Sequence, residues 1–470
     1  MTFVEAPRVA VAGFSGDSGK TLVALALLLG ARARGLNVQA FKKGPDYIDA
    51  AWLTWASGGP ARNLDTFLAG ADAAARRFSR HAAGSGGLNV IEGNRGLLDG
   101  VDAAGTHSTA ALAELLRAPV LLVLNATKMT ATAAASVRGC QALAPGLTLA
   151  GVVLNQVAGS RHAAIAREAT EGSCGVPVVG VIPRLAQSEL LPGRHLGLVP
   201  PREHQGLEGA ADALRRIAQE HLALDRILEA ASAAPPIDAL PAGGDPAASP
   251  RERVQSLEIG YVSDSAFSFY YPENLEALEA RGARLIPLSS LASEALPGSL
   301  SALYIGGGFP ETHGPAIAAN LPFLGALRQA AEQGLPVFAE CGGLMLLADA
   351  VSWRGQRYAM AGVVPVEIEV FDTPQGHGYM LLSVDRANPF FPIGTEFRAH
   401  EFHYSRMAGR VPATSCAVLR GTGCGGGRDA VSVHRVWAGY AHVHADAGPA
   451  WADGMIRAAR EYRAEAGGRT

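Results

Sequence analysis

Residues 8–34 constrain the fold of this chain most strongly. A buried-strand pattern at residues 8–13 runs directly into a glycine-rich segment that ends in Gly19-Lys20-Thr21, and residues 22–34 are apolar at helical spacing. A strand, a glycine-rich loop, Gly-Lys-Thr and a helix, in this order, are typical of a phosphate-binding loop. The chain should therefore contain a strand-to-helix unit whose connecting turn binds phosphate, which favours an α/β fold.

We expect this loop to bind the phosphates of a nucleotide. The N–H groups of the loop, around Gly16 and Gly19, and the helix N-terminus can cradle phosphate oxygens. Lys20 can reach the terminal phosphates, and the Thr21 hydroxyl can ligate Mg²⁺. Five residues separate Gly13 from Gly19, where the usual loop has four. The longer loop resembles that of dethiobiotin synthetase, a P-loop enzyme that activates a carboxylate.

Two further predicted strands deliver charged side chains to the same edge of the sheet. Residues 87–91 form a strand that ends at Glu92, where P-loop enzymes place an acidic residue for the metal. Residues 37–41 form a strand followed by two cations and two carboxylates: Lys42, Lys43, Asp46 and Asp49. Because open α/β sheets bind ligands at the carboxyl ends of their strands, we expect a ligand site at this edge.

The remaining elements of the first half complete a doubly wound parallel sheet. Residues 119–124, 149–154 and 176–182 are buried-strand patterns that alternate with helical segments. Asn155 ends the second of these strands, where its amide can pair with an adenine edge or form a turn. A helix over residues 207–230 should close the domain.

Chain length and composition indicate the domain boundaries. The chain has 470 residues, enough for two or three domains, and 48% of them are hydrophobic, as in ordinary globular proteins. Residues 229–251 are rich in Pro, Gly and Ala without periodicity, which marks a linker. We therefore predict a domain over residues 1–230, a linker over 231–253 and a second domain over 254–470.

Charge, cysteines and hydropathy exclude several classes of protein. The net charge of −3 argues against a general nucleic-acid binder. Five cysteines form no metal-binding spacing and no paired framework, which favours a reduced, cytoplasmic location. No secretory signal pattern opens the chain, and no stretch reaches the roughly 20 apolar residues of a membrane span. We expect no membrane partner.

A second motif lies at residues 335–347. An apolar run fit for a buried strand stops at Glu340-Cys341, two glycines follow, and an apolar segment can then open a helix. This order is typical of a nucleophile elbow, a sharp turn that exposes the nucleophile. The helix N-terminus should lower the pKa of the Cys341 thiol. Alternatively, Cys341 is a small buried residue, as free cysteines usually are.

Two other segments can complete a thiol nucleophile. The strand at residues 302–305 is followed by Gly306, Gly307 and Gly308, whose N–H groups can stabilise an oxyanion. The run Ala438-Gly-Tyr-Ala-His442-Val-His444 resembles the terminal strand and turn of class I glutamine amidotransferases. His442 is favoured over His444 as the base. That class usually carries Glu two residues after the base, where this chain has His444, so the third triad member stays open, and a His-x-His metal pair is the alternative.

Several segments together resemble the cobyrinate a,c-diamide synthase family. They are Lys43-Gly-Pro-Asp46-Tyr47-Ile48-Asp49, Arg62-Asn63-Leu64-Asp65, and Glu92-Gly-Asn-Arg95-Gly-Leu-Leu-Asp99-Gly. The resemblance implies an N-terminal ATP-dependent synthetase domain and a C-terminal class I glutamine amidotransferase-like α/β domain. It implies that Lys20, Thr21 and Lys43 bind ATP, that Thr21, Asp46 and Glu92 hold Mg²⁺, and that six residues line the nucleotide and macrocycle site: Tyr47, Asp49, Asn63, Asp65, Arg95 and Asp99.

The resemblance also implies a reaction. Cys341, with His442, would release ammonia from L-glutamine, and ATP would activate the a- and c-acetate carboxylates of cobyrinate or hydrogenobyrinate as acyl phosphates, in cobalamin biosynthesis. Arg62, Arg95, Lys42 and Lys43 would suit such a tetrapyrrole polyanion. The alternatives are amidation of sirohaem or Ni-sirohydrochlorin, and a P-loop regulatory ATPase with an inactive amidotransferase domain. A homodimer is compatible with this assignment.

Overall fold

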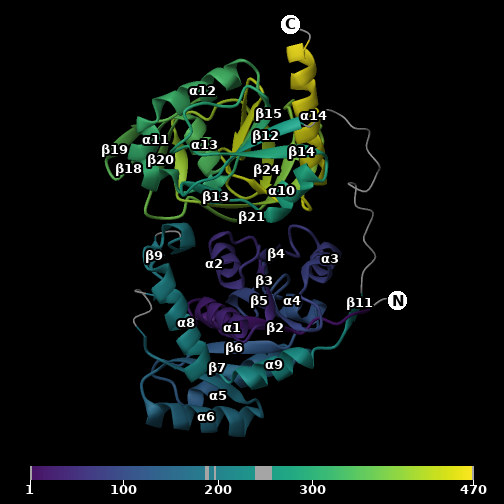
Figure 1. Cartoon of the computed structure of the whole chain (residues 1–470), viewed down its shortest axis with the longest axis vertical. Helices are drawn as coiled ribbons and strands as arrows, with labels where there is room; N and C mark the ends of the chain where they lie inside the picture. The colour runs from purple at the N-terminus through teal and green to yellow at the C-terminus, as the bar shows by residue number, and fades with distance from the viewer. Residues whose placement is uncertain (1–2, 186–189, 195–196, 239–256, 468–470) are drawn as a thin grey trace. The chain divides into compact units, whose positions relative to one another are not determined.

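The computed structural model describes residues 3–185, 190–194, 197–238 and 257–467. The chain divides into two compact units, Met1–Gly243 and Gly244–Thr470, called here the N-terminal and the C-terminal unit (Figure 1). Most of the predicted linker, residues 239–253, lies outside the described residues. Its first residues belong to the N-terminal unit, because β11 (Ile237–Asp238) pairs with β1 (Phe3–Val4).

The described residues of the N-terminal unit form a seven-stranded parallel sheet in the order β4-β3-β5-β2-β6-β7-β8. Its strands are β2 (Arg8–Gly13), β3 (Asn37–Lys43), β4 (Arg62–Leu64), β5 (Gly87–Gly96), β6 (Val120–Asn125), β7 (Leu149–Val157) and β8 (Val178–Pro183). The strand order reverses at β2, which lies between β5 and β6. Ligands bind at such a switch point in open α/β sheets, and the glycine-rich loop follows β2 directly.

Helices cover both faces of this sheet. They are α1 (Lys20–Ala33), α2 (Ile48–Ser57), α3 (Ala71–His81), α4 (Thr109–Leu115), α5 (Ala131–Leu143), α6 (Ser160–Cys174), α8 (Leu207–His221) and α9 (Leu224–Ser232), with a 3₁₀ turn at Pro201–Glu203 and a hairpin of β9 (Gly193–Arg194) and β10 (Gly197–Leu198). Phe78 of α3, Leu112 of α4 and Val137 of α5 share one buried cluster. On the other face α1 packs against α2, α8 and α9. The predicted doubly wound α/β fold is confirmed.

The single helix predicted over residues 207–230 is wrong. Helix α8 ends at His221 and α9 begins at Leu224. Between them, Leu222 forms an antiparallel bridge with Gly180 of the edge strand β8. The Ala223 N–H donates to the Val179 carbonyl at 2.7 Å. Pairing with the sheet edge satisfies backbone groups that a continuous helix would have used internally, so the helix is interrupted there.

The described residues of the C-terminal unit form a ten-stranded sheet in the order β14-β12-β15-β17-β26-β25-β24-β21-β22-β27. Its strands are β12 (Leu257–Val262), β14 (Ala283–Leu288), β15 (Leu300–Ile305), β17 (Val337–Glu340), β21 (Gly376–Val384), β22 (Glu396–His403), β24 (Thr414–Arg420), β25 (Arg428–Val433), β26 (Val436–Gly439) and β27 (His442–Val443). The neighbours from β14 to β26 pair in parallel and the rest antiparallel.

Smaller elements surround this sheet. They are the pair β13 (Phe267–Phe269) and β16 (Gly307–Gly308), the four-stranded sheet of β18 (Ala348–Trp353), β19 (Gln356–Ala359), β20 (Val364–Val370) and β23 (Ser405–Ala408), the helices α10 (Pro272–Glu279), α11 (Gly314–Ala319), α12 (Leu321–Glu332), α13 (Gly342–Leu347) and α14 (Pro449–Gly467), and a 3₁₀ turn at Pro310–His313. The short segments β16, β17, β27 and α13 position the site described below.

Alternation along β17 and β26 builds a core on each face of the large sheet. Phe338 of β17 stacks on Trp437 of β26, with ring centroids 4.3 Å apart, and both pack with Trp451 of α14. The adjacent residues Ala339 and Ala438 lie in the opposite cluster, together with α13. Because successive side chains of a strand point to opposite faces, α13 and α14 lie on opposite sides of the sheet.

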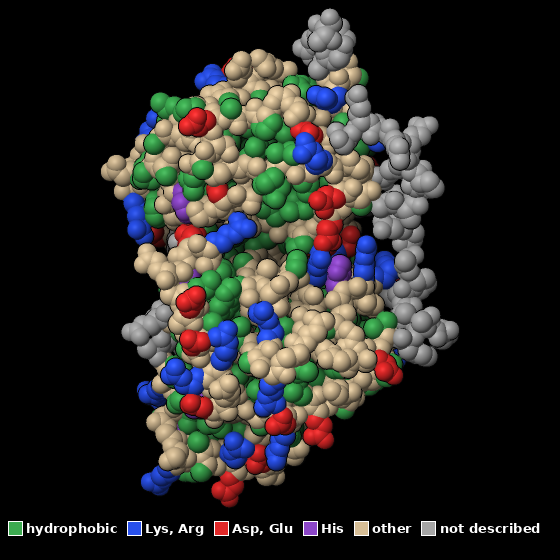
Figure 2. All heavy atoms as spheres, in the orientation of Figure 1, with side chains coloured by type: hydrophobic (Ala, Val, Ile, Leu, Met, Phe, Trp, Pro, Cys, Tyr) green, Lys and Arg blue, Asp and Glu red, His purple; other side chains and the backbone are tan. Residues whose placement is uncertain are grey.

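Two observations bear on the predicted partners. Among the described residues, none of the helices combines the length and the apolar character that crossing a bilayer would need. On the face that Figure 2 shows, basic and acidic side chains of the described residues are interspersed. A mixed surface of this kind agrees with the small net charge of −3.

Candidate functional sites

The glycine-rich loop between β2 and α1 is held by its own residues. The Ser18 hydroxyl donates to the Ser15 carbonyl at 2.9 Å and accepts from the Ser15 N–H at 3.1 Å. Lys20 Nζ lies 3.4 Å from the same carbonyl, so the ammonium folds back over the loop. Burial and the charge of Lys42 lower the pKa of Lys20. A Cβ atom at Gly16 would meet no atom within 4 Å, so the loop is open at this residue.

Asn155 braces this loop from the end of β7. Its Nδ2 donates to the Ser18 carbonyl at 2.9 Å, and its side chain is fully buried. Gly19, which caps α1, has φ of 97°, and a Cβ atom on it would lie 2.2 Å from Asn155 Nδ2. Asn155 therefore has a structural role that was not predicted, and pairing with adenine stays a prediction.

Replacing Gly19 with alanine should weaken ATP binding. A left-handed backbone costs alanine about 1–2 kcal/mol, and the new methyl would displace the Asn155 amide that braces the loop. We expect the KM for ATP to rise at least about tenfold, the equivalent of about 1.4 kcal/mol. Gly35→Ala is the matched control, because Gly35 has φ of 80° and no atom within 4 Å of its Cβ position. Equal KM values for the two variants would refute a role for the Asn155 contact.

Lys42 joins the predicted metal and substrate residues into one buried cluster. Its Nζ donates to Asp49 Oδ2 at 2.6 Å, Glu92 Oε1 at 3.1 Å and the Gly93 carbonyl at 3.0 Å. Burial alone would lower the pKa of Lys42, but Asp49 and Glu92 outweigh it and raise the pKa. Lys42 is only 1% exposed. The prediction that it serves as a cation open to a polyanionic substrate is therefore wrong, because its three donors are taken up inside the protein.

The residues predicted to hold Mg²⁺ include a carboxylate oxygen that suits a cation. The Thr21 hydroxyl donates to Glu92 Oε1 at 2.7 Å, while Glu92 Oε2 is buried and has no hydrogen-bond partner within the described part of the chain. Burial raises the pKa of Glu92. Hard cations take hydroxyl, carboxylate and phosphate oxygens as ligands. Thr21 and Glu92 therefore fit Mg²⁺ beside the phosphate loop.

Asp46 lies at the start of α2, close to this cluster. Its Oδ1 accepts from the Asp49 N–H at 2.7 Å, and burial, together with the Asp49 carboxylate, raises the pKa of Asp46 to about 7. No group of three or more His, Cys, Asp or Glu side chains is arranged around a metal position in the described ranges. Asp46 as a metal ligand stays a prediction.

The other predicted ligand residues lie in the last residues of β3, β4 and β5 or shortly after them, and these strands are neighbours in the sheet. Asn63 Nδ2 donates to the Gly44 and Asp46 carbonyls at 2.8 and 2.9 Å. Asp65 Oδ1 accepts from the N–H groups of Phe67 and Leu68, and Asp99 Oδ2 from that of Gly96. Tyr47 precedes α2, Lys43 is buried, and Arg95 is exposed with φ of 50°. Several of these residues thus shape the turns of the edge where the ligand site was predicted.

Cys341 occupies a sharp turn between β17 and α13. Its φ is 48° and its ψ is −97°, a conformation that non-glycine residues rarely adopt. Its N–H donates to the Gly439 carbonyl of β26 at 2.7 Å, and the residue is 7% exposed. Strained residues of this kind concentrate at functional sites. The strand, strained turn and helix match the geometry of a nucleophile elbow.

The prediction that the helix N-terminus lowers the pKa of Cys341 is wrong. Burial and the Glu311 carboxylate raise this pKa, and they outweigh a hydrogen bond from Gly342 that lowers it. Helix α13 spans only six residues, so its dipole is small. A thiol that stays protonated needs a base to become a nucleophile.

The glycine loop before α11 lies between the Cys341 turn and His442. A Cβ atom on Gly342 would be 3.0 Å from the Gly308 nitrogen, and one on Gly307 would be 2.6 Å from His442 Cε1. The Gly306 N–H donates to the Tyr270 hydroxyl at 2.8 Å and is thereby occupied. The Gly308 nitrogen therefore lies beside the residue that follows Cys341, and its N–H is our candidate donor to the predicted oxyanion.

The two candidate bases contact different carboxylates. His442 Nδ1 lies 3.8 Å from Glu340 Oε2, and the Gly307 contact places the His442 ring next to the glycine loop. His444 Nε2 lies 3.7 Å from Glu273 Oε2, and its ring packs on Tyr271 with centroids 4.7 Å apart. His442 is thus the histidine on the side of the predicted oxyanion loop. The two rings have separate partners, which is unlike a shared metal pair.

Asp429 is a residue of this site that sequence reasoning missed. Its carboxylate is fully buried and accepts from the N–H groups of Tyr440 and Ala441 at 3.0 and 3.1 Å. These are the two residues that connect β26 to His442. Burial raises the pKa of Asp429. An isolated Asp in β25 carries no sequence signal for this role, because the contact depends on strand pairing.

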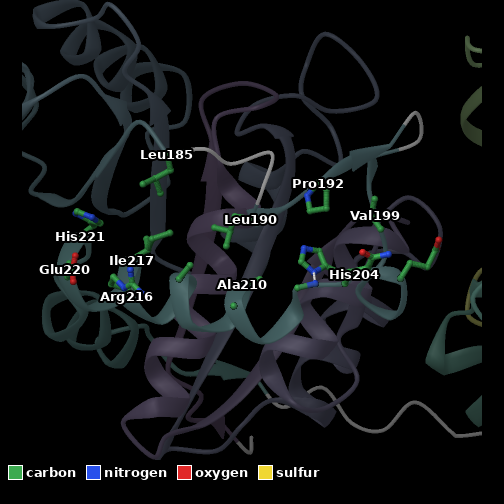
Figure 3. A pocket seen from close by; sticks show the side chains of 15 residues that line it. Leu185, Leu190, Pro192, Val199, His204, Ala210, Arg216, Ile217, Glu220 and His221 are labelled. Carbon is green, nitrogen blue, oxygen red and sulfur yellow. Dashed lines mark hydrogen bonds between the residues drawn. The ribbon is translucent and has the colours of Figure 1, made fainter.

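A separate pocket of about 830 Å³ lies along α8 (Figure 3). Leu185, Leu190 and Ile217 line its apolar part, and Figure 3 shows His204 beside Val199 at its other end. The Trp52 indole of α2 donates to the Val199 carbonyl at 3.0 Å. None of the predicted site residues is among the described residues that line this pocket.

Comparison with known proteins assigns both units. Residues 9–199 match the CobQ/CobB/MinD/ParA nucleotide binding domain, and residues 258–450 match the CobB/CobQ-like glutamine amidotransferase domain. A nucleotide-binding unit and a glutamine amidotransferase unit in one chain define a glutamine-dependent amide-forming ligase.

Curated relatives match the chain over nearly its whole length. It is 42% identical over 459 residues to cobyrinate a,c-diamide synthase of Magnetococcus marinus, with 97% of each chain covered. It is 36% identical to the enzymes of that name from Archaeoglobus fulgidus, with 94% of this chain and 95% of the relative covered, and Methanothermobacter thermautotrophicus, with 97% and 100% covered. The chain belongs to the cobyrinate a,c-diamide synthase family.

Proposed function

We propose that this protein amidates the a- and c-acetate carboxylates of cobyrinate or hydrogenobyrinate, with ATP and L-glutamine as co-substrates, in cobalamin biosynthesis. The observation that carries the choice of substrate is the 42% identity, over 97% of both chains, to a cobyrinate a,c-diamide synthase. Amidation of sirohaem or Ni-sirohydrochlorin is the alternative, since these tetrapyrroles carry equivalent acetate groups.

Ammonia is produced in the C-terminal unit. His442 takes the proton of the Cys341 thiol, and the sulfur attacks the side-chain amide carbon of glutamine. The Gly308 N–H stabilises the negative charge that develops on the amide oxygen. Collapse of this intermediate, with the proton returned by His442, releases ammonia and leaves a thioester on Cys341. Water then hydrolyses the thioester to glutamate and restores the thiol.

Carboxylate activation takes place in the N-terminal unit. The loop N–H groups and Lys20 orient the phosphates of ATP, and a substrate carboxylate oxygen attacks the terminal phosphorus to give an acyl phosphate and ADP. Ammonia then attacks the acyl carbon, and inorganic phosphate leaves with the former carboxylate oxygen. Bound to Thr21 and Glu92, Mg²⁺ would neutralise charge on the phosphates. Buried Lys42 fixes the Asp49 and Glu92 carboxylates in place.

The tetrapyrrole is bound at the edge formed by the ends of β3, β4 and β5. Arg95 suits an acetate carboxylate, because it is exposed there and arginine binds carboxylates in a fork geometry. The remaining contacts come from residues whose turns form that edge: Tyr47, Asp49, Asn63, Asp65 and Asp99. Lys43 and Asp46 lie at the same edge, toward the nucleotide.

Product analysis by mass spectrometry tests the substrate. Purified protein would be incubated with ATP, Mg²⁺ and glutamine, together with cobyrinate, hydrogenobyrinate, sirohaem or Ni-sirohydrochlorin in parallel. We expect two amide groups on cobyrinate or hydrogenobyrinate, with a monoamide that appears first and then declines. Amidation of only sirohaem or Ni-sirohydrochlorin would refute the proposed substrate and leave the ligase chemistry intact.

A further inference from the structure

Glu340, the residue before Cys341, has a buried carboxylate that the reaction above leaves without a role. The residue ends β17 and is 0% exposed. Its Oε1 accepts from the Val443 N–H at 2.8 Å, and its Oε2 accepts from the Tyr304 hydroxyl at 3.0 Å. Among the described residues, the ion-pair partner of this carboxylate is His442, whose Nδ1 lies 3.8 Å from Oε2.

The position of this carboxylate determines how His442 can act. A carboxylate next to Nδ1 favours the tautomer that carries its proton on Nδ1. The unprotonated Nε2 can then accept the proton of the Cys341 thiol. The thiol needs this help, because burial and Glu311 raise its pKa. Once His442 is protonated, the negative charge of Glu340 also stabilises the imidazolium.

We propose that Glu340 is the positioning residue of His442, the third member of the nucleophile–base–orienter set. This proposal rests on the proposed glutaminase function of Cys341 and His442. His444, which stands where class I amidotransferases usually carry their glutamate, is not available for this role. Its ring faces Glu273 and Tyr271 instead. The orienting carboxylate thus comes from the strand before the nucleophile.

The surroundings of Glu340 hold it in place. Asn274 of α10 donates to the Tyr304 hydroxyl at 3.1 Å and to the Val443 carbonyl at 2.7 Å, and it accepts from the Ala445 N–H at 2.7 Å. Asn274, Tyr304 and Glu340 therefore form one buried network that also fixes β27, the strand on which His442 lies. Such a network restrains both partners of the Glu340–His442 pair.

Glu340→Gln tests this role with a change of charge and little change of shape. The Gln carbonyl can still accept from Val443, but its NH₂ group would face Nδ1 and favour the wrong tautomer of His442. We expect the kcat for glutamine hydrolysis to fall about 10²–10⁴-fold, as when the orienter of a catalytic histidine is removed. The KM for glutamine should stay within about twofold of wild type, and ammonium-supported amidation should be unchanged, which reports an intact fold.

Glu273→Gln is the matched control, because it neutralises the carboxylate beside the other histidine. We expect a kcat within about threefold of wild type. The proposal is overturned if Glu340→Gln keeps its kcat within about threefold, or if both variants lose kcat equally. Cys341→Ser distinguishes a failure of the proposed function from a failure of the Glu340 proposal. If Cys341→Ser retains glutaminase activity, the proposed function is refuted. If Cys341→Ser is inactive while Glu340→Gln is active, only the orienting role of Glu340 is refuted.

A spectroscopic measurement requires no substitution of Glu340. ¹⁵N NMR of protein labelled at its histidine rings reports which ring nitrogen carries the proton, and the signals of His442 are those lost in His442→Gln. We expect neutral His442 to be protonated at Nδ1. Protonation at Nε2 would overturn the proposal even if the Glu340 variant did not fold.

Discussion

Cys341→Ala is expected to abolish glutamine-dependent amidation, by at least about 10³-fold, because alanine cannot form the covalent intermediate. Saturating ammonium salt should restore ATP-dependent amidation in the same variant, because ammonia then reaches the acyl phosphate without the thiol. The measurement is amide formation with each nitrogen source in turn. This rescue is the signature of two separate sites that share one intermediate, ammonia.

Cys416→Ala is the matched control for this experiment. Cys416 is buried, as Cys341 is, but it lies in the cluster that packs with α14, on the other face of the sheet. We expect it to retain both activities. If a folded Cys341→Ala variant is not rescued by ammonium, or if it still uses glutamine, the two-site reaction is refuted.

Lys20→Ala should have the opposite pattern. Amidation should fall by at least about 10³-fold with glutamine and with ammonium alike, because the P-loop lysine stabilises charge on the transferred phosphate. The structure supports this expectation, since the Lys20 ammonium folds over the loop, 3.4 Å from the Ser15 carbonyl. Amide formation supported by saturating ammonium is the measurement.

Arg138→Ala removes an exposed cation from α5 and serves as the control for charge. It should have wild-type activity with both nitrogen sources. Rescue of Lys20→Ala by ammonium would contradict the assignment of carboxylate activation to the phosphate loop. Together, the Cys341 and Lys20 variants divide the reaction into an ammonia-producing half and an ATP-using half.

Local motifs were predictable from the sequence. The strand at residues 8–13 has the predicted bounds, and the helix predicted over residues 22–34 is present as α1, which begins two residues earlier, at Lys20. Both were predictable because a glycine-rich loop and a helix start depend on neighbouring residues. The turn at Cys341 was predictable for the same reason. Two glycines directly after a strand-to-helix junction indicate a tight approach of the backbone wherever the segment lies in the fold.

Features that depend on contacts between distant segments were not predictable. The break between α8 and α9 arises because Leu222 pairs with Gly180, 42 residues earlier. Lys42 forms ion pairs with Asp49 and Glu92, and the sequence alone does not show that these carboxylates lie next to it. The raised pKa of Cys341 likewise reflects its burial and Glu311, neither of which the local motif reveals.

The proposed orienting role of Glu340 was likewise not predictable, although Glu340 is the residue directly before the nucleophile. The sequence places Glu340 next to Cys341, but nothing local brings His442 to its side chain. The parallel pairing of β17 with β26, in which Glu340 faces Gly439, brings the residues after both strands together. A search for glutamate two residues after the base finds His444 instead.

The transfer of labelled oxygen tests most directly whether ATP activates the carboxylate as an acyl phosphate. Cobyrinate labelled with ¹⁸O in its acetate carboxylates would be amidated with unlabelled ATP and glutamine, and the phosphate products would be analysed by mass spectrometry. We predict one ¹⁸O atom in inorganic phosphate for each amide formed, with ADP unlabelled. Appearance of the label in AMP, or amide formation with no label in any phosphate product, would contradict this mechanism.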